Sequence, residues 1–284
     1  MPNLLSSFSW SDAPTTAYLD NLADNQRWST WDSIERLCRG PEPWPDWLVT
    51  AAAAVDTDLG LLKSGKEADV SLLERAVPDD PAPSVVMAAK RYRSTERRLF
   101  HRDTGYTEGR RIRNSRDTRA VARKSSYGRT VEAGLWARAE WNALVTLHTA
   151  GVPVPYPVQI DGTEILMEFI SDGDAAAPRL HQTRPSTAQL EQLFEQLREA
   201  MQTMARLGLV HGDLSPYNTL VSGIDDDEPR MVIIDVPQLV DLASNPYAFD
   251  FLHRDCTNMA TWFTRAGLEV DGDDLLGEVL AHAW

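Results

Sequence analysis

The segment HGDLSPYN at residues 211–218, followed by the apolar run VIID ending at Asp235, decides the fold of this chain. Phosphoryl transfer needs a carboxylate that orients and deprotonates a hydroxyl, and oxygen ligands for a divalent cation that bridges the phosphates. Asp213 suits the first role, while Asn218 and Asp235 suit the second. The pattern therefore predicts a phosphoryl-transfer site with catalytic Asp213, and with Asn218 and Asp235 as metal ligands. A plain turn with a carboxylate at a strand end is the structural alternative.

Two charged residues upstream fit the same site. Lys90 lies in the apolar strand VVMAAKRY, where a lysine is costly unless its charge is paired. Glu140, in the helical segment WARAEWNAL, supplies that partner, and the α- and β-phosphates of a nucleotide supply the rest. The sequence therefore predicts that Lys90 and Glu140 bind ATP. A lysine on an edge strand is the alternative for Lys90 alone.

The turn SGKEADV at residues 64–70 is the candidate phosphate-covering turn. It contains one glycine, but it still presents backbone N–H groups, the Ser64 hydroxyl and the Lys66 charge to phosphate. We therefore expect Ser64 and Lys66 to bind ATP. A simple hairpin turn is nearly as well supported by this segment alone.

The segment LMEFI at residues 166–170 is the expected connector between two lobes and the adenine-binding segment. Met167, Glu168 and Ile170 are its predicted ATP-binding residues. Main-chain groups of Glu168 and Ile170 would pair with adenine, so the identity of the side chains matters little there.

Hydrophobic patterns predict three strands, one helix, two strands and then a mostly helical half. The first three strands read as an antiparallel meander, and Ser186 with Gln189 forms a capping box for a helix that Gly208 ends. The expected strands are Leu59–Lys63, Val70–Ala76, Val85–Tyr92, Tyr156–Ile160, Ile165–Phe169, Thr219–Ser222 and Met231–Asp235. The expected helices are Glu132–Thr149, Ser186–Leu207, Pro246–Arg265 and Asp273–His282.

The expected organisation has three parts. Residues 1–58 form a tryptophan-rich extension, 59–170 an N-terminal lobe with a basic loop at 91–130, and 171–284 a C-terminal lobe. Within the extension, a short helix capped by Ser29 or Thr30 is expected to end at Gly40. A second is expected at Trp47–Val55. The extension reads as a packing segment rather than a separate binding module.

The charge is unevenly distributed. The chain of 284 residues has a net charge of −14, yet residues 91–130 contain thirteen Lys or Arg and four acidic residues. Such a run is either a solvated loop or a contact for phosphates, including those of RNA. Net acidity argues against broad affinity for nucleic acids.

Composition indicates a soluble cytoplasmic protein without a membrane partner. The two cysteines, Cys38 and Cys256, are too few for a disulfide framework and fit a reducing compartment. The N-terminus lacks a secretory signal pattern, and the longest apolar run is about half of a membrane span.

These motifs resemble the RIO family of atypical serine/threonine protein kinases, from about Leu59 to Gly267. SGKEADV, AAKRYR, MEFI with APRL, LVHGDLSPYN and IIDVPQ each have a similar motif in that family. The tail NPYAFDFLHRDCTNMATWF is the most specific match. The resemblance implies an α+β, two-lobed protein-kinase-like fold. Its N-terminal lobe has an antiparallel sheet plus helix C, and its truncated helical C-terminal lobe lacks an activation loop.

The resemblance also implies roles. ATP and Mg²⁺, with Mn²⁺ as an alternative metal, are the expected cofactors. The counterpart of Asp235 in the family binds metal and can accept phosphate, and the counterpart of Asp213 is the proton acceptor. The chain departs from the family at Gly212, at Pro216 and at the VPQ after Asp235, but no departure removes a catalytic group.

Three functions follow from these observations. The first is a RIO-like, ATP-dependent serine/threonine kinase or ATPase acting on an unknown protein or on itself. The second is a small-molecule phosphotransferase of the aminoglycoside or choline type, which usually carries a larger helical insertion. The third is a nucleotide-gated protein that binds RNA or a ribosome-assembly partner through residues 91–130.

Overall fold

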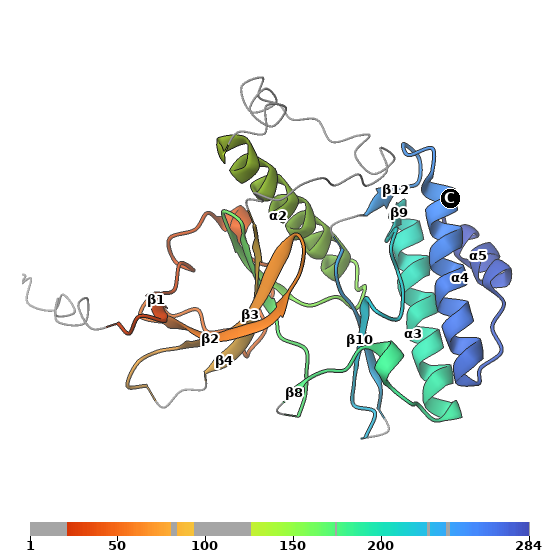
Figure 1. The fold of residues 1–284 in the computed structure, drawn as a ribbon, viewed down its shortest axis with the longest axis horizontal. Helices are drawn as coiled ribbons and strands as arrows, with labels where there is room; N and C mark the ends of the chain where they lie inside the picture. Colours follow the sequence, from red (N-terminus) through yellow and green to blue (C-terminus); the bar gives the residue numbers. More distant parts are fainter. Residues whose placement is uncertain are drawn as a thin grey trace, which may run out of the picture.

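The computed structural model describes residues 22–80, 84–93, 126–173, 175–225, 228–236 and 239–283. They form two lobes (Figure 1), with a curled antiparallel sheet in one and a group of helices in the other. The α+β, two-lobed architecture predicted from the sequence is therefore confirmed. Most of the basic segment 91–130 lies outside the described residues.

The N-terminal lobe contains one six-stranded sheet in the order β1-β2-β3-β4-β6-β5. Every neighbouring pair is antiparallel. The strands are β1 (Gln26–Trp28), β2 (Val55–Ser64), β3 (Ala68–Ala76), β4 (Val85–Tyr92), β5 (Pro157–Asp161) and β6 (Glu164–Glu168). The strand expected from Leu59 begins at Val55. β1 was not predicted, because three residues, QRW, are too few to show an alternating pattern.

The strand register assigns residues to the two faces of the sheet. Directly paired residues in antiparallel strands point to the same face. Lys63 pairs with Val70, Val70 with Lys90 and Lys90 with Ile165, which makes one row across four strands. Ile165 packs in the core that contains the buried side chains of α2 (Ser126–Thr149). This row therefore lies on the inner face, toward α2.

The N-terminal segment covers the outer face of the sheet. Trp31, 2% exposed, and Leu48 pack in one apolar cluster with Leu73 and Met87 of the sheet. Burial of large apolar side chains is the main stabilising contribution here. The described part of the segment, residues 22–54, therefore packs directly on the lobe.

The two helices expected in this segment are not formed. Residues 31–34 make a turn, and only η2 (Arg36–Cys38), a single turn of 3-10 helix, follows before Gly40. The run Trp47–Val55 consists of irregular chain, short turns and the first residue of β2. A segment of nine residues forms a helix only where tertiary packing of one face stabilises it. Leu48 and Ala54 are instead buried by packing on the sheet.

α2 packs on the inner face of the sheet and begins six residues before the expected Glu132. The buried stripe of α2 contains Ala137, Trp141, Leu144 and Leu147, with the helical spacing of a core-facing surface. Leu135 lies outside this stripe and is 44% exposed.

In its described residues, the C-terminal lobe has three α-helices, one 3-10 turn and three small two-stranded sheets, β7–β8, β9–β12 and β10–β11. Its helices are η4 (Leu180–Gln182, one 3-10 turn), α3 (Thr187–Arg206), α4 (Ala248–Ala266) and α5 (Gly272–Leu280). Its strands are β7 (Ser171–Asp172), β8 (Ala175–Ala176), β9 (Leu209–Val210), β10 (Thr219–Ser222), β11 (Arg230–Ile233) and β12 (Val240–Asp241).

The predicted capping box is present at the start of α3. The Ser186 hydroxyl accepts a hydrogen bond from the Gln189 N–H, and the Gln189 side chain bonds back to the Ser186 N–H. Gly208 follows the helix with a φ of 71°, a conformation that favours glycine.

Little chain separates Asp235 from the last helices, since α4 begins at Ala248. This agrees with a truncated C-terminal lobe without an activation loop. Within the described ranges, no helix combines the length and apolar character needed to cross a membrane.

Candidate active site

Lys90 joins the two lobes through two carboxylates. Its Nζ lies 2.6 Å from Glu140 Oε1 on α2 and 3.1 Å from Asp235 Oδ1 of the C-terminal lobe. We call Lys90, Glu140 and Asp235 the cleft cluster. The structure therefore brings together the lysine, the helix glutamate and the aspartate that the sequence predicted to act at one site.

The charges in the cleft cluster reinforce each other. Burial alone would lower the pKa of Lys90, but the Glu140 and Asp235 carboxylates outweigh it and raise the pKa above its usual value. Burial would raise the pKa of Asp235, but the Lys90 charge lowers it below its usual value. Lys90 is therefore cationic and Asp235 anionic at neutral pH.

Tyr92 is a site residue that sequence reasoning missed. Its hydroxyl donates to Glu140 Oε2, and Lys90 Nζ lies 5.4 Å from the centroid of its ring. Burial and the Glu140 charge raise the pKa of Tyr92 well above its usual value, so the hydroxyl stays a donor. The spacing of two residues from Lys90 was the available signal, since alternate residues of a strand share a face.

Asp235 has an unusual backbone. It follows β11 with a φ of 63°, in the left-handed region that residues other than glycine rarely adopt. Its side chain is 51% exposed, whereas that of Lys90 is 14% exposed. Such backbone conformations are concentrated at functional sites. The turn directs one carboxylate oxygen to Lys90 and leaves the group open to the cleft.

Asp213 and Asn218 are linked within the loop 211–218. Asn218 Nδ2 donates to the Asp213 carbonyl at 2.9 Å and to Asp213 Oδ2 at 3.4 Å. The Ile234 N–H donates to the Asn218 carbonyl at 2.9 Å, which ties this loop to the segment carrying Asp235. The amide of Asn218 is engaged as a donor, so its side-chain oxygen is the atom suited to a cation.

A buried aspartate on α4 holds this loop, and sequence reasoning did not single it out. The two Asp255 oxygens accept from the Gly212 N–H at 2.8 Å and the Leu214 N–H at 2.9 Å. The Arg254 side chain donates to the Gly212 carbonyl. Gly212 has a φ of 83°, in the left-handed region that favours glycine. The two N–H donors flank Asp213 and fix its place in the loop.

His211 is buried and neutral beneath the loop. Its Nδ1 accepts from the Asp213 N–H at 3.3 Å, and its Nε2 lies 3.4 Å from the Ile234 carbonyl. Burial lowers the pKa of His211 below its usual value. A neutral ring with the proton on Nε2 satisfies both contacts.

The connector residues lie at the end of β6. Met167 pairs with Ala88 and Pro157, and the Glu168 N–H donates to the Tyr156 carbonyl at 2.9 Å. The Ile170 carbonyl accepts from the Ala177 N–H at 3.0 Å. Among the described residues, the Ile170 N–H has no hydrogen-bond partner, so it is the donor that remains for a purine.

The phosphate-covering turn does not place the side chains of Ser64 and Lys66 next to the cleft cluster. Ser64 pairs with Asp69, and Asp69 pairs with Arg91, which makes a row on the outer face. The Ser64 hydroxyl accepts from Arg93 at 2.6 Å. Lys66 is exposed in the turn. The structure therefore does not bring the Ser64 hydroxyl or the Lys66 side chain to Lys90.

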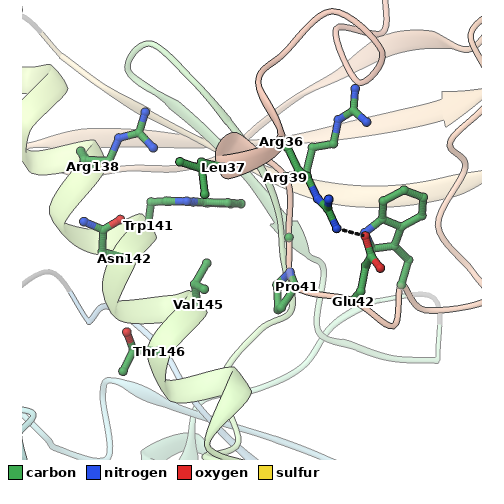
Figure 2. Close-up of a pocket in the computed structure, with 12 residues that line it drawn as sticks. Arg36, Leu37, Arg39, Pro41, Glu42, Arg138, Trp141, Asn142, Val145 and Thr146 are labelled. Atoms are coloured by element: carbon green, nitrogen blue, oxygen red, sulfur yellow. Dashed lines mark hydrogen bonds and ion pairs between the residues drawn. The ribbon is translucent and has the colours of Figure 1, made fainter.

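A separate groove lies between α2 and η2 with the residues that follow it (Figure 2). It has a volume of about 720 Å³. Leu37, Trp141 and Val145 line it, together with the cations Arg36 and Arg138. None of the predicted site residues lines this groove, so it is distinct from the cleft.

The residues present suit Mg²⁺ held jointly with nucleotide phosphates. In the described part of the chain, no group of three or more His, Cys, Asp or Glu side chains could hold a metal alone. Mg²⁺ sites in phosphotransferases use one or two carboxylates plus phosphate oxygens and water. The open Asp235 carboxylate and the Asn218 oxygen fit that donor set.

The two lobes, the Lys90–Glu140 pair and the loop with Asp213 and Asn218 define a protein-kinase-like fold. The family model "RIO domain" matches residues 85–275. The chain is 37% identical over 222 residues to the RIO-type serine/threonine-protein kinase Rio1 of Haloferax volcanii, covering 78% of this chain and 68% of that one. It is 35% identical over 136 residues to human serine/threonine-protein kinase RIO1, covering 48% of this chain and 23% of that one.

A solved structure agrees in fold. The crystal structure of the Rio2 kinase-ADP/Mg²⁺-phosphoaspartate complex from Chaetomium thermophilum aligns with a TM-score of 0.54 and 22% identity, covering 78% of this chain and 61% of that one. The chain belongs to the RIO family of protein kinases. Membership favours a RIO-type kinase or ATPase over an aminoglycoside- or choline-type phosphotransferase.

Proposed function

We propose that this chain binds Mg-ATP between its lobes and transfers the γ-phosphate, as a serine/threonine kinase, as an ATPase, or as both. The observation that carries this proposal is the cleft cluster, in which Lys90 Nζ contacts Glu140 and Asp235 from two lobes. A lysine suited to phosphates and an aspartate suited to a metal ion therefore lie together, which supports the proposal. The limits of the lobes near residues 58 and 170 are part of the proposal.

Each residue has a proposed role in the transfer. Lys90, oriented by Glu140, binds the α- and β-phosphates, and the Ile170 N–H binds adenine. Asn218 and Asp235 would hold Mg²⁺, which supplies positive charge to the phosphate oxygens. Backbone N–H groups of the turn 64–70 cover the phosphates.

Asp213 orients the acceptor hydroxyl. As the new P–O bond forms and the bond to ADP breaks, the hydroxyl proton passes to the Asp213 carboxylate.

Asp235 is itself a proposed acceptor. One carboxylate oxygen would attack the γ-phosphorus while ADP leaves, which gives an acyl phosphate that water then hydrolyses. The open, half-exposed position of this carboxylate supports the proposal. The Rio2 kinase structure named above contains phosphoaspartate.

The phosphate acceptor, the binding partners and the cellular location are also proposals. A protein substrate or the chain itself is the proposed acceptor, and residues 91–130 are a proposed contact for RNA or a ribosomal partner. Cys38 and Cys256 are both free thiols, which fits the proposed cytoplasmic setting. Mn²⁺ is expected to replace Mg²⁺.

The test follows the label from γ-³²P-ATP into protein, an added protein substrate and free phosphate. With Mg²⁺ or Mn²⁺ the label should leave ATP, and with EDTA it should not. Protein-bound label on Asp235 should be released by hydroxylamine and be absent from Asp235→Asn. Turnover in EDTA would reject the metal role. Hydroxylamine-resistant label that persists in Asp235→Asn would reject the acyl phosphate.

A further inference from the structure

Lys63 lies in the same row as Lys90, on the face of the sheet that borders the cleft. Lys63 pairs with Val70, and Val70 pairs with Lys90. Paired residues share a face, and strands two apart are separated by about 10 Å. Lys63 is exposed at the end of β2, and within the described residues it has no hydrogen bond or ion pair. Its ammonium group is therefore available to a ligand in the cleft.

The charges around Lys63 come from both lobes. Partial burial lowers the pKa of Lys63 below its usual value, the nearby positive charges of Arg179 and Lys90 lower it further, and the Asp235 carboxylate opposes them. Arg179 is held in place in the C-terminal lobe by a hydrogen bond from its side chain to the Tyr217 carbonyl. Lys63 thus has two neighbouring cations and one neighbouring carboxylate, that of Asp235, which is already paired with Lys90. An anionic ligand would relieve this excess of positive charge.

The order of the strands shows which part of a nucleotide reaches Lys63. The connector with Ile170 follows β6, Lys90 is on β4 next to it, and Lys63 is two strands further along in β2. A nucleotide with its adenine at the connector and its first phosphates at Lys90 extends its next phosphate toward β2. The Ser64 hydroxyl lies in the neighbouring row on the opposite face, bonded to Arg93. Lys63 is thus the side chain at this strand end directed to the cleft.

We infer that Lys63 contacts the γ-phosphate of bound ATP and so makes the site prefer ATP over ADP. This inference rests on the proposed function, since it assumes that Mg-ATP binds in the cleft. Arg179 approaches the same phosphate from the C-terminal lobe. Lys90, in contrast, serves both nucleotides, because ATP and ADP share the α- and β-phosphates.

The test compares the affinities of the full-length chain for Mg-ATP and Mg-ADP by calorimetry. Lys63→Gln should weaken ATP binding about tenfold, the loss expected for one hydrogen bond to a charged group. Its ADP affinity should change less than about twofold, because the group contacted by Lys63 is missing from ADP. Lys63→Arg keeps the charge and should keep the preference for ATP.

Leu61→Gln is the matched control. Leu61 is exposed on the same strand, but it pairs with Ser71, the neighbour of Val70, so it points to the opposite face. It should leave both affinities unchanged. Equal losses for ATP and ADP in Lys63→Gln, or no loss for either, would overturn the inference while the proposed function stands. Failure of the wild-type chain to bind Mg-ATP would overturn both.

Discussion

Two charged clusters lie on opposite faces of the same sheet, and they differ in how deeply their side chains are buried. On the outer face, Arg75 Nε and Nη2 donate to Asp56 at 2.6 and 3.0 Å, and Nη2 also donates to Gln159 at 3.0 Å. We call Asp56, Arg75 and Gln159 the outer cluster. On the inner face, the cleft cluster joins Lys90 to Glu140 and Asp235.

Exposure separates the two clusters. The Arg75 and Asp56 side chains are 0% and 1% exposed, whereas Asp235 is 51% exposed. The outer cluster uses the planar guanidinium, which fixes two parallel bonds to one carboxylate. The cleft cluster uses an ammonium group, a point charge that can exchange partners. The difference in exposure and in the type of cation indicates that the outer cluster stabilises the fold, whereas the cleft cluster is arranged to bind a ligand.

The largest expected effect is on stability, from Arg75→Ala. This change leaves the buried Asp56 carboxylate with only a 3.7 Å ion pair to Arg27, which is 43% exposed, so the free energy of unfolding should fall by about 3–5 kcal/mol. Denaturant unfolding measures it. The matched control is Arg198→Ala, which removes solvent-accessible ion pairs with Glu195 and Glu278 and should cost at most about 1 kcal/mol. Equal losses in the two variants would contradict the structural role of the outer cluster.

Lys90→Ala should reduce activity strongly and stability less than Arg75→Ala does. Phosphate transfer should fall about 10²- to 10³-fold, as when one preorganised donor to developing charge is removed. The free energy of unfolding should fall less than in Arg75→Ala, because Tyr92 still donates to Glu140 and Asp235 is open to water. Steady-state turnover and denaturant unfolding on the same samples test this. If the Lys90→Ala variant were unstable but fully active when folded, the prediction that Lys90 serves activity rather than stability would be contradicted.

The Asp255 carboxylate accepts hydrogen bonds from backbone N–H groups, and its contribution to the free energy of unfolding should depend on pH. Burial raises the pKa of Asp255 to about 7, although the Gly212 and Leu214 N–H groups act against the shift. A folded-state pKa above the unfolded value gives stability that is full below about pH 4 and is lost as pH rises through 7.

This group should therefore lower the free energy of unfolding by about 1.4 kcal/mol per pH unit between pH 5 and 6.5. Asp255→Asn should lack that slope. Denaturant midpoints of both proteins from pH 5 to 8 provide the measurement, and parallel curves would show that Asp255 does not titrate there.

Tyr92→Phe should have the smallest effect. It removes one hydrogen bond to Glu140 but leaves Lys90 paired, so we expect a loss of about 1 kcal/mol in stability. Transfer should fall only several-fold, because Glu140 keeps one of its two partners. A loss of activity as large as that of Lys90→Ala would show that the tyrosine does more than orient the glutamate.

The sequence predicted the features that local patterns encode. The strand runs, the capping box at Ser186 and the motif at residues 211–218 are short and strongly patterned, and the strand with Lys90 was placed correctly. The contact between Lys90 and Glu140 followed from the cost of burying a lone charge. Each of these depends on few residues close together in the chain.

The features that were missed depend on register and on distant contacts. Leu135 is apolar yet exposed, because the buried stripe of α2 passes through Trp141. Ser64 and Lys63 are adjacent, and only the pairing with β3 shows which of them faces the cleft. The Asp255 contacts join residues 41 and 43 positions apart, which no local pattern reveals.

The most direct test of the central claim, phosphoryl transfer at the cleft, compares wild type and Asp213→Asn with γ-³²P-ATP and Mg²⁺. Binding of Mg-ATP should be nearly unchanged, because Asp213 lies in the loop with Asn218 and its proposed role is toward the acceptor. Transfer of label should fall about 10²- to 10⁴-fold, as expected for a lost general base. Equal rates of transfer in the two proteins would contradict the account.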